Sequence, residues 1–155
     1  MKPIQNVLIG LNTSDLDPLL IEFASFISRS SPARKFYFIN VIKNLKVPNE
    51  VKKEFPELVK NAVKERRKHI RSIIGEHLKI HPGSSSKIFV KSGEPYREML
   101  KLVEQYDIDL IIMATHGRSG ISRWIRGSVA EKILRASPAP VLLVRAPGTL
   151  SDHKV

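Results

Sequence analysis

Short runs of apolar residues alternate along this chain with segments whose apolar residues repeat at helical spacing. This alternation constrains the fold more than any other feature of the sequence. The short runs are rich in β-branched or aromatic residues, and they cover Val7–Leu11, Phe36–Ile42, Lys87–Val90, Leu110–Met113 and Val141–Val144. Consecutive apolar residues of this kind are typical of strands that are buried on both faces. The pattern therefore predicts a mainly parallel sheet with helices on both sides.

Four helices are expected between these strands. Three of them begin at a dipeptide that ends in proline, a residue that favours the first helical turn: Asp17-Pro18, with Asp17 as the N-cap, Phe55-Pro56 and Glu94-Pro95. The second of these helices is expected to continue to Leu78. The fourth is expected to be capped by Ser128, with Val129, Ile133 and Leu134 facing the sheet. These features predict an α/β fold: a single doubly wound, Rossmann-like domain in which four helices flank a five-stranded sheet.

A chain of 155 residues is long enough for one domain with its own core. We assign residues 1–146 to this domain and expect residues 147–155 to form a short, flexible tail. The absence of cysteine excludes disulfide bonds, thiolate metal sites and a cysteine nucleophile, and it fits a reducing compartment. The first apolar run is too short for a signal peptide, and no run is long enough to span a membrane. We therefore expect a cytoplasmic protein without a membrane partner.

The formal net charge of +11 favours an anionic partner. The surplus is largest between residues 43 and 101, where fifteen basic residues stand against seven acidic ones. Six of the basic residues lie in the helix expected from residue 56 to 78: Lys60, Lys64, Arg66, Arg67, Lys68 and Arg71. We interpret these residues as a solvated helix surface, with a nucleic-acid surface as the alternative. Because this stretch lacks aromatic residues that could stack on bases, we expect no specific binding of nucleic acid.

Doubly wound sheets bind ligands at the carboxyl ends of their strands, so the loops that follow strands are the places to search. The loop from residue 114 to 126 carries the clearest signal. Gly117 and Gly120 allow backbone N–H groups to approach an anion closely, and Gly127-Ser128 adds a helix N-terminus and a hydroxyl group. These residues predict a phosphate site. They match neither the Walker pattern nor the dinucleotide-binding pattern.

The spacing of Gly117 and Gly127-Ser128, with nine residues between, resembles the nucleotide-binding signature of universal stress proteins. The similarity extends to the first strand with Asn12-Thr13-Ser14 and to Gly93-Glu94-Pro95. It also includes the closing segment from Ala136 to Arg145. On these residues the chain is identified as a member of that family, of the ATP-binding type.

The resemblance implies that ATP, or alternatively ADP or AMP, lies with its adenine near the first loop and its phosphates across the glycine-rich loop. The residues implied to bind this cofactor are Leu11, Asn12, Thr13, Val41, Met113, Ala114, His116, Gly117, Arg118, Gly127, Ser128 and Val129. Asn12 stands where nucleotide-binding members usually have aspartate. An amide lacks the charge that Mg²⁺ or Mn²⁺ prefers, so support for a divalent cation is weakened, and no metal ligand is assigned.

No catalytic residue is assigned. His116 has no Ser, Asp or Glu beside it at catalytic spacing, and Arg118 either binds phosphate or faces solvent. The expected function is a nucleotide-binding regulatory module in the stress response. The alternatives are a slow ATP hydrolase and an interaction protein of the same family that binds no nucleotide. The resemblance also implies a homodimer that pairs through Val141–Val144 and a protein partner that the sequence does not identify.

Overall fold

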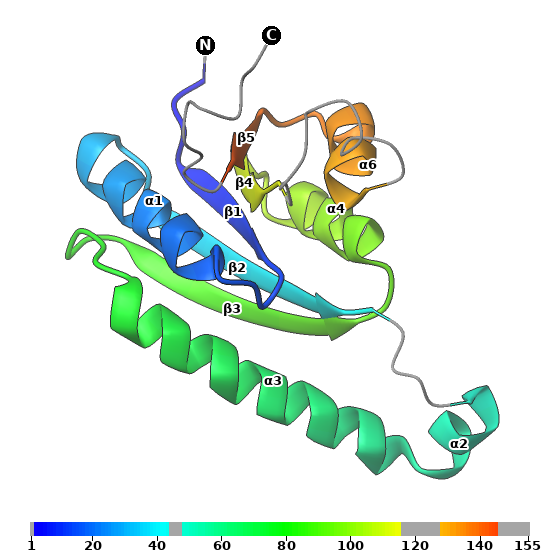
Figure 1. Cartoon of the computed structure of the whole chain (residues 1–155). Helices are drawn as coiled ribbons and strands as arrows, with labels where there is room; N and C mark the ends of the chain where they lie inside the picture. The colour runs from blue at the N-terminus through cyan, green and yellow to red at the C-terminus, as the bar shows by residue number, and fades with distance from the viewer. Residues whose placement is uncertain (1, 44–47, 116–127, 146–155) are drawn as a thin grey trace, which may run out of the picture.

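The computed structural model describes residues 2–43, 48–115 and 128–145, which contain a sheet of five parallel strands (Figure 1). The strands are β1 (Asn6–Leu11), β2 (Lys35–Ile42), β3 (Ser85–Ser92), β4 (Leu110–Ala114) and β5 (Val141–Val144). They lie in the order β3-β2-β1-β4-β5, and each neighbouring pair is parallel. The chain adds strands on one side of β1 and then on the other. The junction of β1 with β4 is therefore the topological switch point.

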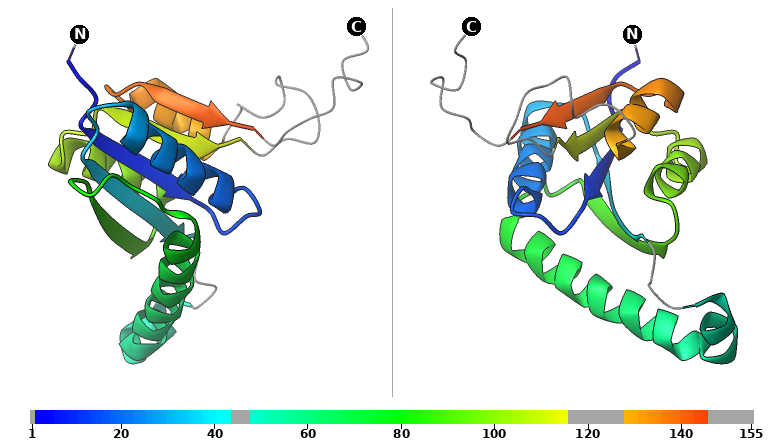
Figure 2. Two further views of the ribbon diagram at one scale, coloured as in Figure 1. Left: turned by 90° about the vertical axis from the view of Figure 1, so that its left-hand side faces the viewer. Right: turned by 45° about the vertical axis from the view of Figure 1, so that its right-hand side comes forward.

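Helices cover both faces of this sheet (Figures 1 and 2). They are α1 (Asp17–Ser30), α2 (Asn49–Glu54), α3 (Pro56–His77), α4 (Pro95–Gln105) and α6 (Val129–Ala136). Helices α1 and α3 pack on one face, and α4 and α6 pack on the other. The expected α/β fold is confirmed, and the described residues contain one helix that was not expected. Helix α2 lies where a loop was expected. It buries none of its residues, so it has no apolar stripe from which sequence periodicity could predict it.

The core consists of two apolar clusters, one on each face of the sheet. Along β1, Val7 and Ile9 pack in the cluster beneath α1 and α3, whereas Leu8 packs in the cluster beneath α4. Gly10 also faces α4. A Cβ atom at this position would lie 3.0 Å from the terminal methyl carbon of Met99, so the absence of a side chain lets α4 approach the end of β1 closely.

Two details of the predicted helices are wrong. Asp17 is the first residue of α1 rather than its N-cap, and the capping position falls on Leu16, which makes no side-chain cap. Leu134 is 43% exposed, whereas its neighbour Ile133 is fully buried. Helix α6 has only two turns, and its apolar pattern could not decide which of these two residues faces the sheet. The predicted cap of α6 is confirmed, because the Ser128 hydroxyl accepts a hydrogen bond from the Glu131 N–H at 3.1 Å.

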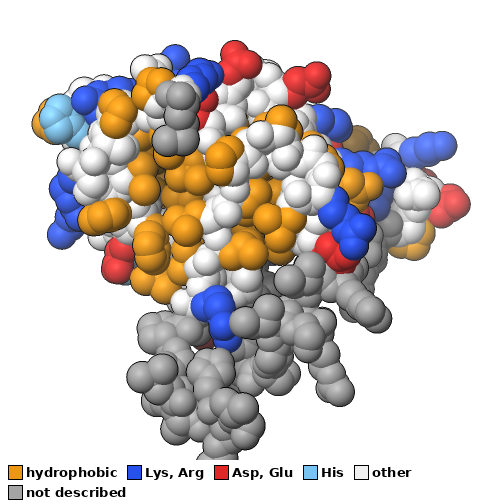
Figure 3. All heavy atoms as spheres, turned by 90° about the horizontal axis from the view of Figure 1, so that it is seen from above, with side chains coloured by type: hydrophobic (Ala, Val, Ile, Leu, Met, Phe, Trp, Pro, Cys, Tyr) orange, Lys and Arg blue, Asp and Glu red, His pale blue; other side chains and the backbone are white. Residues whose placement is uncertain are grey.

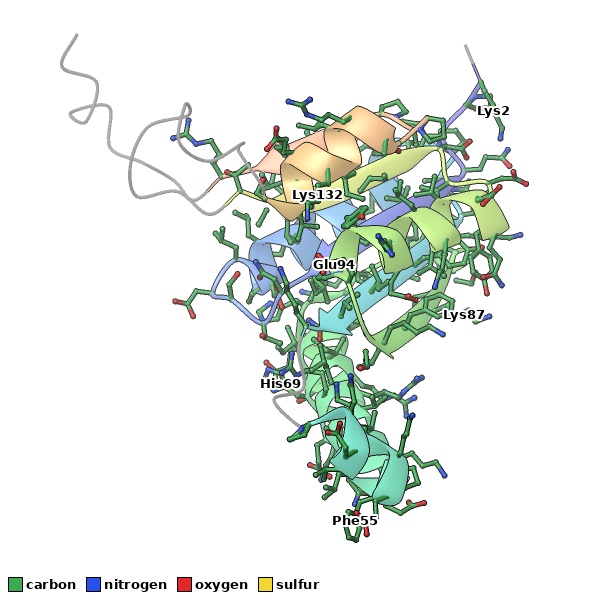
Figure 4. The ribbon with its side chains drawn as sticks, turned by 90° about the vertical axis from the view of Figure 1, so that its right-hand side faces the viewer. Lys2, Phe55, His69, Lys87, Glu94 and Lys132 are labelled. Carbon is green, nitrogen blue, oxygen red and sulfur yellow. The ribbon has the colours of Figure 1, made fainter. Side chains whose placement is uncertain are left out.

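Helix α3 reaches well beyond the sheet. Its C-terminal half is fixed by the buried residues Ile70 and Ile74, while its N-terminal half extends outward to Phe55 at the far tip (Figures 2 and 4). None of the helices in the described residues combines the length and the apolar character needed to cross a membrane. The place where α3 leaves the sheet is close to the carboxyl ends of the strands, which brings one of its side chains to the site described next.

Candidate functional site

A pocket of about 290 Å³ opens at the carboxyl edge of the sheet, across the ends of β1, β2 and β4. It therefore lies at the topological switch point. Its wall is largely apolar and includes Gly10, Ile39, Val41, Pro95, Met99 and Met113. Polar groups are fewer and are contributed by Asn12, Asn40, Arg66, Thr115 and Ser128. A largely apolar pocket with a few polar groups is typical of a site for a small molecule or cofactor.

A buried carboxylate orders the loop between β1 and α1. The side chain of Asp17 is fully buried and accepts hydrogen bonds from the backbone N–H groups of Asn12 at 3.1 Å and Thr13 at 2.9 Å. Thr13 has a left-handed backbone with φ of 59°, and the Asn12 side-chain oxygen accepts a hydrogen bond from the Ser14 N–H. These contacts fix the turn that carries Asn12 at the edge of the pocket.

The environment of Asp17 also affects its ionisation. Burial raises the pKa of this carboxyl group above its ordinary value of 3.8, because a charge is poorly solvated away from water. The backbone donors at Asn12, Thr13 and Ser14 act in the opposite direction and reduce the rise. Asp17 therefore supports the loop at an electrostatic cost.

One end of the pocket is formed by the N-terminus of α6. Ser128, Val129 and Ala130 line it, and the first N–H groups of a helix have no acceptor within the helix. They can donate to an anion. Helix α6 packs against α4, and Lys132 lies over the Tyr96 ring and 3.9 Å from Glu94 at the start of α4 (Figure 4). These contacts hold α4 and α6 together at this end of the pocket.

The other end of the pocket is formed by side chains from β2 and α3. The Arg66 Nη1 atom donates a hydrogen bond to the Asn40 Oδ1 atom at 3.0 Å. The Asn40 amide nitrogen donates in turn to the backbone oxygen of Leu11 at 2.9 Å. Because Asn40 is 2% exposed and both ends of its amide are bonded, it holds the Arg66 guanidinium in a defined position beside β1.

The structure gathers many of the sequence-predicted site residues around this pocket. Its wall includes Leu11, Asn12, Val41, Met113, Ala114, Ser128 and Val129. Thr13 is not part of the wall, but its N–H binds Asp17 and so orders the adjoining loop. The remaining predicted residues, His116, Gly117, Arg118 and Gly127, lie outside the described residues, as does the predicted tail from residue 147 to 155.

The end of the pocket formed by Asn40 and Arg66 was not predicted from the sequence. Arg66 was interpreted as part of a solvated basic surface. Its position nevertheless carried a signal, because Arg66, Ile70 and Ile74 are spaced four residues apart and share one helix face. A cation within a buried stripe is expected to lie near a polar group or a ligand, because buried charges are nearly always paired. Asn40, a polar residue within an otherwise apolar strand, was a second signal of the same kind.

Comparisons with known proteins place this arrangement in a family. Residues 3–145 match the sequence model of the universal stress protein family. The chain belongs to that family. It is 30% identical over 97 residues to universal stress protein MJ0577 of Methanocaldococcus jannaschii, covering 63% of this chain and 54% of that protein. It is 29% identical over 147 residues to universal stress protein MJ0531 of the same organism, covering 92% and 83% of the two chains.

Solved structures of universal stress proteins share the fold. The structure of MJ0577 gives a TM-score of 0.70 at 21% identity and covers 96% of this chain and all of that one. A universal stress protein in complex with cAMP gives 0.64 at 18% identity, covering 94% and 100% of the two chains. The protein from Archaeoglobus fulgidus in complex with dAMP gives 0.57 at 16% identity, covering 92% and 98%.

Proposed function

We propose that this universal stress protein is a regulatory module that binds an adenine nucleotide in the pocket at the β1 and β4 switch point. The observation that carries the proposal is the lining of the pocket, which is largely apolar and includes the N-terminus of α6. The apolar wall that includes Ile39, Met99 and Met113 suits a base, and the N–H groups of α6 suit phosphate oxygens. The cAMP and dAMP complexes of structurally similar proteins support the proposal.

ATP is the first ligand to test, with ADP and AMP as alternatives. We expect Mg²⁺ or Mn²⁺ to contribute little to binding. The Asn12 side chain offers the pocket a neutral amide, and its oxygen already accepts a hydrogen bond from Ser14.

We propose that the protein acts as a homodimer and exerts its regulatory effect by binding a protein partner. Strand β5 is an edge strand, and Val141, Leu142 and Leu143 remain partly exposed. The face on which β5 is outermost shows a broad area of hydrophobic side chains (Figure 3). An apolar edge of this kind favours pairing with a second copy about a two-fold axis. Light scattering should then give about twice 17.5 kDa at micromolar concentration, and a monomer would contradict the pairing.

Nucleotide binding is tested by calorimetry with ATP and AMP on the full chain and on two variants of Ala130, which lines the pocket in the first turn of α6. In Ala130→Glu the new carboxylate suits a helix N-terminus but repels phosphate, so affinity should fall roughly tenfold or more while the fold is retained. Ala130→Gln is the matched uncharged control, and its affinity for ATP and AMP should fall much less. Equal affinity in both variants would place the phosphates elsewhere.

A further inference from the structure

Arg66 is the one ionised side chain among the described residues that line the pocket. The described wall contains no carboxylate, and the hydrogen bond of Arg66 within the pocket goes to the neutral amide of Asn40. A guanidinium carries five N–H donors, and this contact uses one of them. The end of the pocket beside α3 therefore offers a positive charge and several donors without an opposite charge from the described protein wall.

The position of this cation is set before any ligand binds. Asn40 is fixed by its hydrogen bond to the Leu11 backbone oxygen, and α3 is fixed by Ile70 and Ile74 one and two turns further along. The Arg66 side chain is partly buried. A guanidinium held in this way loses little conformational freedom when it binds an oxyanion.

The two polar ends of the pocket lie on either side of β1. Asn40 belongs to β2, whereas Ser128 and Val129 line the pocket beside the end of β4. Neighbouring strands are about 4.8 Å apart, so the ends of β2 and β4 are separated by roughly 10 Å. A nucleotide whose 5′-phosphate lies at α6 would extend its base and ribose toward Arg66.

We propose that Arg66 forms a second anion subsite, and that the preferred ligand is a nucleotide with an additional phosphate at the 2′ or 3′ position of its ribose. In nucleotide-binding sheets a carboxylate recognises the free ribose hydroxyls, whereas an arginine accommodates a ribose phosphate. The described wall of this pocket has the arginine and lacks the carboxylate. This inference rests on the proposed nucleotide binding and adds the class of nucleotide.

The test compares AMP with adenosine 2′,5′-bisphosphate and adenosine 3′,5′-bisphosphate by calorimetry on the full chain at constant ionic strength. At least one bisphosphate should bind about tenfold more tightly than AMP, because it adds a charge-assisted contact. In Arg66→Gln this preference should disappear, so that neither bisphosphate binds more than about threefold more tightly than AMP does to the same variant. Arg66→Lys keeps the charge without the planar fork and should retain part of the preference.

Arg67→Gln provides the matched control, because it removes the same charge from the next position on α3. The Arg67 side chain is exposed, and its Nη1 atom donates a hydrogen bond to the Ile88 backbone oxygen at 3.5 Å. The Arg67→Gln variant should retain the preference for the bisphosphate. Circular dichroism and thermal unfolding check that each variant is folded.

The outcomes separate the inference from the proposed function. If the wild-type protein binds neither AMP nor ATP, the proposed function fails. If it binds AMP but neither bisphosphate more tightly, the second subsite is wrong. A preference that survives in Arg66→Gln, or that is lost equally in Arg67→Gln, assigns the effect to the general positive charge of the protein and overturns the role of Arg66.

Discussion

The two ends of the pocket are built in different ways. At the α6 end, consecutive residues from Ser128 to Ala130 present a helix N-terminus and a hydroxyl group. At the α3 end, Asn40 and Arg66 meet although they are 26 residues apart, and both contribute through side chains. The first end suits any phosphate, whereas the second depends on one charge and one amide. Changes at α6 should therefore alter whether a nucleotide binds, and changes at α3 should alter which nucleotide binds.

The largest effect is expected from Asp17, which supports the loop between these two ends. In Asp17→Ala the N–H groups of Asn12 and Thr13 lose their acceptor, so the free energy of unfolding should fall by about 2 kcal/mol, as measured by chemical denaturation. The affinities for AMP and for the bisphosphates should both fall, because the loop lies between the two ends of the pocket. The exposed residue Asp15 supplies the control, because Asp15→Ala should change stability by less than about 0.5 kcal/mol.

A smaller effect, confined to one end, is expected from Asn40. Asn40→Leu removes the anchor of Arg66 and leaves the Leu11 backbone oxygen without its donor. The free energy of unfolding should fall by about 1 kcal/mol, and the preference for a ribose phosphate should be lost while AMP still binds. Asn61→Leu, at an exposed position of α3, is the control. Equal loss of affinity for AMP and the bisphosphates in Asn40→Leu would show that the two ends do not act separately.

The ionisation of Asp17 predicts a modest dependence of stability on pH. Because the folded protein raises the pKa of this group above 3.8, it binds the proton more tightly than the unfolded chain does. The contribution of Asp17 to the free energy of unfolding is therefore greatest below the unfolded pKa and decreases as the pH rises through the folded pKa. The wild-type stability minus that of Asp17→Asn should fall across this window. A difference that rises would contradict the direction of the shift.

The smallest change is expected from Asn12→Asp, which adds a carboxylate at the edge of the pocket. ATP affinity should increase about twofold to fivefold in the presence of Mg²⁺ and should not increase in EDTA, because the carboxylate acts by supporting the cation. It should also weaken binding of a ribose phosphate by repulsion. Calorimetry with and without the metal measures both effects. An equal gain in EDTA would show that the amide at position 12 does not limit metal-assisted binding.

The contrast between the two ends also explains what could be predicted from the sequence. The strands were predictable because they are short runs of consecutive apolar residues, and α1, α3, α4 and α6 were predictable because apolar residues recur in them at helical spacing. The α6 end was predictable because Ser128 and its neighbours are consecutive. Helix α2 was missed because it packs no apolar stripe, and the α3 end was missed because the contact of Asn40 with Arg66 exists only after β2 and α3 have packed. A contact between residues 26 positions apart cannot be predicted from local sequence patterns.

Nuclear magnetic resonance tests the location of the ligand most directly. When AMP is added to isotopically labelled protein, the amide signals of Gly10, Asn40 and Ala130 should shift together in a saturable way, because these residues line the pocket. The signal of Gly83, in the turn before β3 at the opposite edge of the sheet, should not move. Shifts concentrated instead around Lys2 and Asp109, at that opposite edge, or no saturable shifts at all, would contradict a nucleotide site at the β1 and β4 switch point.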